Sequence, residues 1–411
     1  MIPTIVSVSA LLLSFAILCL GHGLQNTLLG VRATIEHYPA WVTGVMMSGY
    51  FLGFIFGSSL CARLISIVGQ VRTFAAFASI ASAISLLHVI FVNEITWIIL
   101  RLIYGVCIAG LYVVIESWLN ALSNRKNRGR ILSLYMIISF LCLSSGQFFI
   151  FFAEPSEFVL FAVVSILISV ALVPLTVSRT KQPDIHDADN FGFYKLFKIS
   201  PLATFGCVGT GLTLGAFWGL GAVYFTQIGY SSHDVALVIG VTYLGGLLFQ
   251  WPIGTLSDLF NRRVTITVVL FLSVLTCIAM VYLYYKKMDH MGMPLFITAI
   301  LFGGFSYTLY SLFIALANDY LEPKYLVRAT GGLIVLHAIG AIFGPILASV
   351  AMTYMDSVGM FVFIAFIHSL VFLVAFVRSF MGKEIPEETS ENFVSIPKTG
   401  SAVIELDPRQ E

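Results

Sequence analysis

Long apolar runs, each about the length of a membrane-spanning helix, alternate with short polar gaps along most of the chain. A helix needs ~20 mostly apolar residues to cross ~30 Å of hydrocarbon. The runs that meet this requirement are residues 3–29, 41–62, 72–92, 95–119, 129–152, 157–177, 200–227, 234–255, 263–285, 294–317, 329–353 and 359–378. Unbroken runs of this length exclude transmembrane strands, which would show ~10-residue alternating segments. The pattern therefore predicts an all-α integral membrane protein with twelve transmembrane helices.

The longest polar interruption between spans divides them six and six. It reads "SRTKQPDIHDADNFGFYKLFK" at residues 178–198. We expect residues 1–177 to form an N-terminal six-helix bundle, 178–199 a cytoplasmic linker and 200–380 a C-terminal six-helix bundle. Residues 381–411 are polar, acidic and contain proline, which predicts a disordered cytoplasmic tail.

An even number of spans in each half starts both halves on the same side of the membrane. That arrangement allows a parallel internal repeat, in which the second bundle repeats the first. Matching residues occur at offsets of 192 and 198 positions, among them the pairs Tyr38 and Tyr230, Gly53 and Gly245, Arg130 and Arg328, and Gly146 and Gly344. The sequence thus predicts two six-helix bundles related by a parallel repeat.

The amino-acid composition agrees with this fold and limits the kinds of molecule that the protein is expected to bind. The 411 residues are 58% hydrophobic and 10% charged, against ~45–50% and ~25% in ordinary soluble domains. A lipid bilayer is the environment that can accept this excess of apolar surface. The net charge of +1 provides no field that would attract nucleic acid, so we expect no nucleic-acid partner.

The basic residues predict the orientation, because Lys and Arg collect in cytoplasmic loops. If the N-terminus is cytoplasmic, outside loops hold only Arg32, Lys286 and Lys287 of the 22 basic residues, and Arg101 lies inside a span. No Lys or Arg precedes Arg32, so the first run lacks the basic start of a secretion signal and is expected to be retained. We expect a multi-pass protein of the cell inner membrane with both termini cytoplasmic.

The stretch "GTLSDLFNRR" (254–263) places Gly254, Asp258, Arg262 and Arg263 in the gap between spans 8 and 9. This resembles the loop signature of the major facilitator superfamily, G-x-x-x-D-[RK]-x-G-[RK]-[RK]. Leu259 and Asn261 depart from the signature. The equivalent first-half stretch, "ARLISIVGQVR", matches less well, since Ala62 and Ser66 stand in the Gly and Asp places.

Further stretches narrow the resemblance. "VVIESWLNALSNRKNRGRILSLYM", "NTL" at 26–28 and "GP" at 344–345 resemble the uncharacterised YcaD-like subfamily of that superfamily. The resemblance implies the superfamily fold and a central cavity lined by spans 1, 4, 7 and 10. It implies no particular substrate.

Two interpretations of the charged gap remain open. Asp258 can pair with an Arg from the other half, such as Arg130 at the start of span 5, and so form a conformational latch. It can instead cap the next helix, in a loop that only fixes topology. In the first half Arg328 would meet Ser66, which cannot form an ion pair, so we expect an asymmetric latch. Glu116, near the cytoplasmic end of span 4, either pairs with loop Arg residues or transfers protons.

Few ionisable side chains lie within the spans, where a central charge costs ~2.5–3.5 kcal/mol on insertion scales. Arg101 lies about two turns from the outer end of span 4 and shares one helical face with Glu116. It either contacts an anion or tunes a coupling proton, as the superfamily resemblance suggests. The alternative is that it reaches the outer surface or pairs with helix ends. Gln25 and Asn26 in span 1 suit polar groups of a substrate, or interhelical hydrogen bonds.

Aromatic side chains in spans 7 and 10 complete the expected pathway. Trp218, Tyr307 and Tyr310 lie in the spans that the resemblance assigns to the cavity, where they could stack on a ring or a sugar. For each of them ordinary packing is the alternative.

The motifs that are missing limit the function. The chain has no G-x-x-x-x-G-K-[ST], H-E-x-x-H or G-x-S-x-G motif, so we expect no enzyme and no cofactor or metal. We expect a monomeric secondary transporter that moves a small solute by alternating access, with H⁺ as the coupling ion. The alternative is a non-transporting membrane receptor or scaffold with the same fold.

Overall fold

The computed structural model describes residues 2–123, 127–177, 193–286, 292–321, 325–381 and 393 of the chain. Over these ranges the chain is helical apart from short connections. The helices are α1 (Ile2–Ile35), α2 (Ala40–Val68), α3 (Gln70–Ile90), α4 (Glu94–Leu122), α5 (Arg128–Gly146), η1 (Gln147–Phe152), α6 (Phe158–Val170), α7 (Leu172–Val177), α8 (Phe193–Ile199), α9 (Pro201–Gln227), α10 (Ser232–Leu259), α11 (Arg262–Tyr285), α12 (Met293–Asn318), α13 (Leu326–Met355) and α14 (Gly359–Met381).

Within the described ranges, 12 helical segments are long and apolar enough to cross a membrane. This confirms the twelve predicted spans and the all-α membrane fold. The fifth span combines α5 with η1 (Arg128–Phe152), and the sixth combines α6 with α7 (Phe158–Thr176). The largest differences from the prediction are in the first two spans, because α1 continues to Ile35 and α2 continues to Val68.

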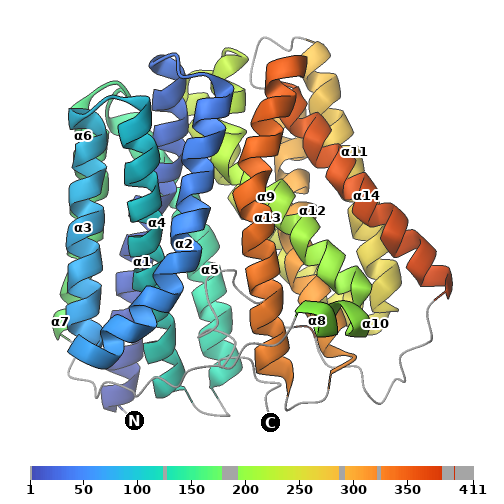
Figure 1. The fold of residues 1–411 in the computed structure, drawn as a ribbon, viewed down its shortest axis with the longest axis horizontal. Coiled ribbons are helices and arrows are strands. Elements are labelled where there is room, and N and C mark those ends of the chain that lie inside the picture. Colours follow the sequence, from blue (N-terminus) through green and yellow to red (C-terminus); the bar gives the residue numbers. More distant parts are fainter. Residues whose placement is uncertain are drawn as a thin grey trace.

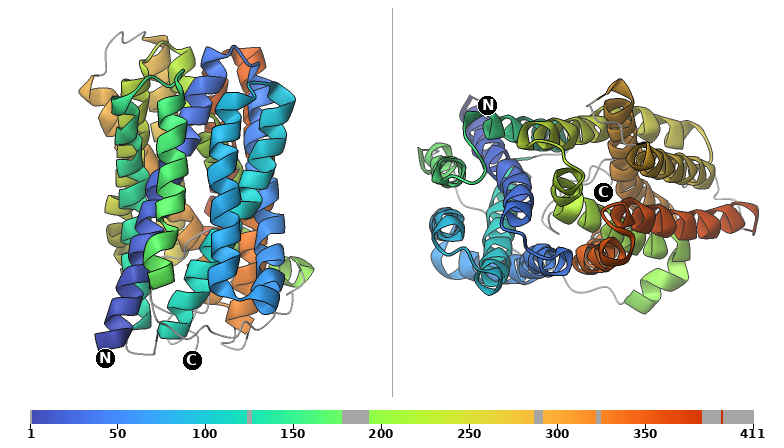
Figure 2. Two further views of the ribbon diagram at one scale, coloured as in Figure 1. Left: turned by 90° about the vertical axis from the view of Figure 1, so that its left-hand side faces the viewer. Right: turned by 90° about the horizontal axis from the view of Figure 1, so that it is seen from above.

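The helices form two bundles that lie side by side (Figures 1 and 2). We call the end where α1 begins the lower end; it also holds the α2–α3 junction at Gly69 and the α10–α11 junction at residues 260–261. The upper end holds the connections at residues 36–39 and 228–231. In Figure 1, α2 of the first bundle and α13 of the second lie together near the upper end and diverge toward the lower end.

Glycines show how the second bundle repeats the packing of the first. A Cβ on Gly53 (α2) would collide with the carbonyl oxygen of Leu102 in α4, and a Cβ on Gly245 (α10) would collide with that of Ile300 in α12. These two glycines are one of the pairs at an offset of 192 residues. Because only a glycine lets the two backbones approach so closely, the matched pair reflects the same helix crossing in each bundle.

A second matched pair repeats a different crossing. A Cβ on Gly146 (α5) would collide with the carbonyl oxygen of Leu20 in α1, and a Cβ on Gly344 (α13) with that of Leu212 in α9. The offset of 198 residues thus relates α5 to α13, and the contacted residues Leu20 and Leu212 relate α1 to α9 at an offset of 192. Pro345 lies inside α13, which stays helical through it.

Large apolar side chains are exposed on the outside of the bundles, as expected of a surface that contacts lipid. Examples are Phe56 at 61%, Leu248 at 60% and Phe366 at 59% relative exposure. Each bundle also has its own apolar core: one cluster is built almost wholly from α1 to α7, and two others mainly from α9 to α14.

The expected linker and tail lie mostly outside the described residues. Residues 193–199 of the linker form the short helix α8, and α14 extends to Met381, the first residue of the expected tail. Residues 178–192, 382–392 and 394–411 are not among those described. The expected linker and the expected disordered tail are therefore predictions that the structure does not test.

Candidate functional site

A cavity lies between the two bundles, and both bundles contribute to its wall. Its lining comes from α1, α2, α4 and α5 of the first bundle and from α9, α10, α12 and α13 of the second. The centre of a water-sized sphere can occupy about 140 Å³ of it. The polar and charged lining residues are His22, Asn26, Arg101, Ser139, Gln250, Ser311 and His337, and the aromatic ones are Tyr50, Phe51, Phe54, Tyr112, Phe140, Trp218, Tyr243 and Tyr307.

Arg101 is the single Lys, Arg, Asp or Glu among the described residues that line the cavity. Its side chain is buried, with 2% of the residue exposed. Its Nη2 donates to the Oδ1 of Asn26 at 3.1 Å and contacts the Sδ of Met47 at 3.5 Å. The guanidinium also lies 4.7 Å from the ring centroid of Tyr50, a distance at which the ring face attracts a cation.

The remaining nitrogens of Arg101 are buried without a partner. Nε and Nη1 have no hydrogen-bond partner, and no salt bridge of Arg101 occurs within the described part of the chain. A buried cation without a counter-charge is costly in a membrane. The arrangement can therefore bind an anionic group.

His22 and Asn26 extend this polar wall by one helical turn of α1. The Nδ2 of Asn26 lies 3.2 Å from the Nε2 of His22, and the hydroxyl of Tyr50 also lies 3.2 Å from that nitrogen. Because an amide nitrogen can only donate, Nε2 is the acceptor and the ring is neutral with its proton on Nδ1. That Nδ1 has no hydrogen-bond partner. A second N–H donor without a partner thus lies buried near Arg101.

Four aromatic rings form a row along the cavity. Phe51 of α2 stacks with Trp218 at 6.3 Å between centroids, and Trp218 stacks with Tyr307 at 6.0 Å. Tyr307 in turn stacks with Tyr243 at 5.8 Å and accepts a hydrogen bond from the Nε1 of Trp218 at 3.1 Å. The row crosses from the first bundle to the second, and its ring faces suit a flat apolar group.

Close contacts between the bundles lie above the cavity. Gly44 of α2 packs against Ser349 and Pro345 of α13, where a Cβ would not fit. The Oγ of Ser144 (α5) donates to the carbonyl oxygen of Gly240 (α10) at 2.8 Å.

A ring contact at the upper end adds to this closure. The rings of Phe151 in η1 and His233 in α10 stack with centroids 4.6 Å apart. Gly30 of α1 lies against Ala222 of α9, so that a Cβ on Gly30 would be 2.9 Å from that of Ala222. Together these contacts join the two bundles on the upper side of the cavity.

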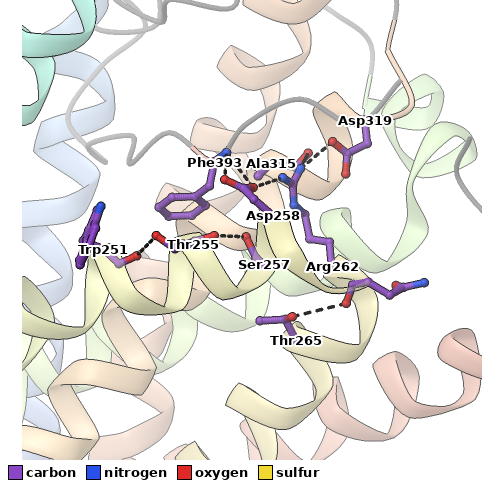
Figure 3. A network of polar contacts seen from close by, with 11 residues as sticks. Trp251, Thr255, Ser257, Asp258, Arg262, Thr265, Ala315, Asp319 and Phe393 are labelled. Carbon is purple, nitrogen blue, oxygen red and sulfur yellow. Dashed lines mark hydrogen bonds and ion pairs between the residues drawn. The ribbon is translucent and has the colours of Figure 1, made fainter. Parts of the chain in front are cut away.

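A second polar cluster ties together the lower ends of three helices in the second bundle (Figure 3). Arg262, at the start of α11, is 4% exposed. Its Nη2 donates to Asp258 of α10 at 2.7 Å, and its Nη1 donates to Asp319 at 2.6 Å and to the carbonyl oxygen of Ala315 in α12 at 3.1 Å. This stretch thus forms an ion-pair network within one bundle.

The expected loop at residues 254–263 is mostly helical. Gly254 and Asp258 belong to α10, and Arg262 and Arg263 belong to α11. The cap of α11 is Asn261, whose side chain accepts from the backbone N–H of Arg263 at 3.0 Å. The expectation that Asp258 caps this helix is therefore wrong, because Asp258 lies too early, in the last turn of α10.

The first bundle carries a neutral counterpart of this network. Gln70, which matches Arg262 at the offset of 192, is fully buried, and its Nε2 donates to Ser117 of α4 at 3.3 Å. Among the described residues, Ser66, the match of Asp258, hydrogen-bonds within its own helix, to the carbonyl oxygen of Arg63. The two bundles thus use the same crossing with different chemistry, ionic in the second bundle and neutral in the first.

Sequence comparison decides the family. The Major Facilitator Superfamily profile matches residues 11–283 and 203–406. The chain belongs to the major facilitator superfamily. Among curated proteins it is 29% identical over 381 residues to "Uncharacterized MFS-type transporter YcaD" of Escherichia coli O7:K1, covering 92% of this chain and 96% of that protein. The same-named protein of Shigella flexneri serotype 5b is 28% identical over 379 residues, with the same coverage.

Solved structures of other superfamily members share the fold at low identity. The nucleoside transporter NupG aligns with a TM-score of 0.72 at 13% identity, covering 92% of this chain and 99% of that one. A bacterial homolog of the human lysosomal transporter Spinster, in an inward-facing and occupied conformation, aligns with a TM-score of 0.70 at 12% identity, covering 93% and 97%. At such identities the likeness extends to the fold alone. The resemblance to the superfamily and to its YcaD-like members is confirmed.

As in the superfamily pattern, spans 1, 4, 7 and 10 contribute to the cavity. Four of the predicted pathway residues line it: Asn26, Arg101, Trp218 and Tyr307. Gln25 and Tyr310 are fully buried and are not among the lining residues.

The predicted latch residues are not gathered in one place. Asp258 pairs with Arg262 within the second bundle, while Arg130 is exposed at the start of α5 in the first bundle. Glu116 is buried and accepts a hydrogen bond from the hydroxyl of Tyr135 in α5 at 2.6 Å. The side chain of Arg328 lies outside the described residues. The latch between Asp258 and Arg130 stays a prediction.

Sequence reasoning missed the cavity residues of spans 2, 5, 8 and 11. Tyr50 and Tyr243 are the clearest cases, because one contacts Arg101 and the other ends the row of rings. Gln250, whose Nε2 donates to Ser311 at 3.0 Å, is another. Gln250 could have been identified from the sequence, because a polar side chain within a span is rare and marks a candidate functional residue. Tyr50 and Tyr243 could not, because tyrosines are common in these apolar runs.

Proposed function

We propose that this superfamily member is a secondary transporter that moves a small solute across the inner membrane by alternating access. The cavity between the bundles carries this proposal. Both bundles line it, and it holds a buried Arg101 with two unpartnered nitrogens. In such transporters the two halves rock around a central site near the middle of the bilayer. A cavity shared by the two bundles would be opened to one side and then to the other by that motion.

The orientation follows from the basic residues. Lys and Arg favour the cytoplasmic side, which assigns the lower end, with its Arg63 and Arg263, to the cytoplasm. The termini are then cytoplasmic. The contacts between bundles above the cavity would make this conformation closed to the outside, with the solute entering or leaving on the cytoplasmic side.

A proton gradient is our proposed energy source, with the solute's own gradient as the alternative. Titratable groups at or near the cavity are His22, His337 and Glu116. In the opposite conformation Asp258 would exchange part of its present pairing for Arg130, which forms the latch predicted above. Such a latch is asymmetric, because the first bundle has Ser66 in the matching place.

Cysteine accessibility tests alternating access without knowledge of the solute. Ser139 lines the cavity on α5, so we choose the Ser139→Cys variant. The native cysteines are buried except for the half-buried Cys142, which is replaced by Ser. A membrane-impermeant maleimide is added to right-side-out cells or to inverted vesicles. We expect labelling from both sides, faster from the cytoplasmic side.

The same experiment separates the transporter from the receptor or scaffold. A scaffold that never opens outward would be labelled from the cytoplasmic side alone, and that outcome would overturn the proposal. Proton coupling is tested separately in proteoliposomes. Uptake that does not respond to an imposed pH gradient would contradict it while leaving alternating access in place.

A further inference from the structure

The wall of the cavity differs sharply in charge and shape from place to place, and this difference points to the kind of solute. At one place Arg101 and its neighbours offer hydrogen-bond donors. Elsewhere the wall is the row of rings formed by Phe51, Trp218, Tyr307 and Tyr243. We propose that the cavity binds a small monoanion that carries an aromatic ring, such as an aromatic carboxylate. This inference rests on the proposed function.

The sign of the charge follows from the lining. No Asp or Glu is among the described residues that line the cavity, so an organic cation would meet Arg101 without a compensating carboxylate. An anion would instead pair with Arg101, which lines the cavity and whose buried Nε and Nη1 have no partner. Hydrogen bonds to a charged partner are the stronger kind and favour a carboxylate over its neutral amide.

A single negative charge fits because Arg101 is the single charged side chain at the wall. A second anionic group would be buried without a partner, which is costly in a site of low dielectric. A bound monoanion also cancels the charge of Arg101. A neutral loaded cavity avoids the cost of carrying a net charge through the middle of the membrane as the bundles move.

The ring of the solute follows from the aromatic part of the wall. The ring faces of Trp218 and Tyr307 are 28° from parallel, and those of Tyr243 and Tyr307 are 10° from parallel. Aromatic rings pack well on such faces in offset stacks. An aliphatic acid as small as acetate would satisfy Arg101 and leave this surface uncovered.

Four matched compounds test the charge and the ring separately. Benzoate, benzamide and benzylamine share one ring and differ in charge, and acetate keeps the charge without the ring. Binding to the full-length protein in nanodiscs is measured by calorimetry and by quenching of tryptophan fluorescence. We expect benzoate to bind at least ~10-fold more tightly than the other three, since a hydrogen bond to a charged group contributes ~1.5–3 kcal/mol and ~1.4 kcal/mol is tenfold.

Variants connect the preference to Arg101. Arg101→Gln should bind benzoate and benzamide equally, whereas Arg101→Lys should keep part of the preference. Arg63→Gln removes the same charge at an exposed position of α2 and should change nothing. If Arg101→Gln fails to fold, the wild-type series and Arg101→Lys still decide.

Several outcomes would overturn the assignment of the solute. These are benzamide or benzylamine binding as tightly as benzoate, acetate binding as tightly as benzoate, or no benzoate binding at its solubility limit. If labelling of Ser139→Cys still occurs from both sides of the membrane, the transporter proposal stands and only the solute class is wrong.

A second feature, independent of the cavity, lies at the lower end of α10 (Figure 3). The backbone N–H of Phe393, far along the chain, donates to both carboxylate oxygens of Asp258 at 2.8 Å each. The ring of Phe393 lies against Gly254, one helical turn earlier, where a Cβ would collide with the ring. The glycine and the aspartate of the signature stretch thus both contact Phe393.

We also infer that the lower end of α10 is a docking site for Phe393 of the same chain, and that this contact competes with the latch. Asp258 already accepts from Arg262 on Oδ1 and from Phe393 on both oxygens. Phe393 contacts Oδ2, the oxygen that Arg262 leaves open, so Phe393 and Arg130 would compete for that oxygen. The docked residue would then favour the conformation that is closed above the cavity.

The first bundle lacks the same docking site. Ala62, which matches Gly254, carries the Cβ that would occupy the ring's place, and Ser66 replaces the aspartate. The site is therefore a property of the second bundle, which agrees with the asymmetric latch.

Disulfide formation tests the docking itself. The pair Gly254→Cys and Phe393→Cys, in the Cys142→Ser background, should oxidise to a linked peptide that mass spectrometry detects. The control pair is Leu256→Cys with Phe393→Cys, because two residues along a helix turn the side chain by ~200°. Equal linkage in both pairs, or none at position 254, would refute docking.

The competition is tested by the labelling assay. Phe393→Ala keeps the backbone N–H but removes the ring that packs against Gly254. The weaker docking should leave Asp258 free more often to pair with Arg130, and so increase the rate at which Ser139→Cys is labelled from outside. Phe366→Ala, which removes a lipid-exposed ring of α14, is the control and should have no effect. An unchanged outside rate in Phe393→Ala would contradict the competition.

Discussion

Replacing Arg262 by Leu should strongly destabilise the second bundle. Arg262 pairs with Asp319, and their side chains are 3% and 1% exposed, whereas Asp258 is 25% exposed. Removing one member of a buried pair leaves an uncompensated charge and costs ~3–5 kcal/mol. The lower value applies here, because Asp258 keeps solvent and Phe393 as partners.

This cost can be converted to a melting temperature. For a cooperative unit of the size of one bundle, ~1 kcal/mol lowers Tm by ~2–4 °C, so ~3 kcal/mol gives a decrease of ~6–12 °C. The assay is thermal unfolding of the purified protein in detergent, followed by intrinsic fluorescence. Arg263→Leu is the matched control. The Arg263 guanidinium is half-buried, lies 5.6 Å from the ring centroid of Tyr320 and donates to its hydroxyl. The ring contact contributes ~0.5–1 kcal/mol and the hydrogen bond ~0.5–1.5 kcal/mol, and their loss leaves no buried charge.

A double variant identifies the cause. Arg262→Leu combined with Asp319→Leu removes both charges, and replacement of a buried ion pair by apolar residues is often neutral. We therefore expect the double variant to regain most of the lost Tm. The reasoning is refuted if Arg262→Leu costs no more than Arg263→Leu, or if the double variant is less stable than the single one.

Three further predictions concern other helices. Gly53→Val should prevent close packing against Leu102, because its Cβ has no room, and gel filtration should show loss of the folded monodisperse protein. Asp258→Asn should lower the free energy of unfolding by less than ~1 kcal/mol, since the pair of Asp258 with Arg262 is partly exposed. An unchanged benzoate transport rate of this variant in proteoliposomes would contradict the latch. Glu116→Gln should abolish the response of that transport to a pH gradient if Glu116 carries the proton; a retained response would exclude it.

The spans were predictable because the bilayer imposes a simple rule on length and polarity. Every segment that crosses hydrocarbon needs ~20 apolar residues, and this requirement is visible without any tertiary contact. Arg101 could be identified as a candidate functional residue for the same reason, since a charged side chain inside a span is costly and therefore rare. Arg101 lies at the cavity wall, and its role in a solute pathway stays a prediction.

Contacts between distant residues were not predictable. The bond from Arg262 to Asp319 joins residues 57 positions apart, and that from Phe393 to Asp258 joins residues 135 apart. Neither pair leaves a periodic pattern in the sequence. The helical course of residues 254–259 was also missed, because charged residues were taken to mark a loop. A helix end tolerates polar residues, and here the break comes only at residues 260–261, where Asn261 caps α11.

Alternating access around the shared cavity is the central claim, and paired distances between the bundles test it most directly. Spin labels replace the exposed Trp41 and Tyr354 at the upper end, or Arg63 and Leu259 at the lower end. Electron–electron distances are measured in nanodiscs with and without benzoate and across a range of pH. We predict two populations, in which a longer upper distance accompanies a shorter lower one. Two distances that stay fixed in every condition, or that lengthen together, would contradict the account.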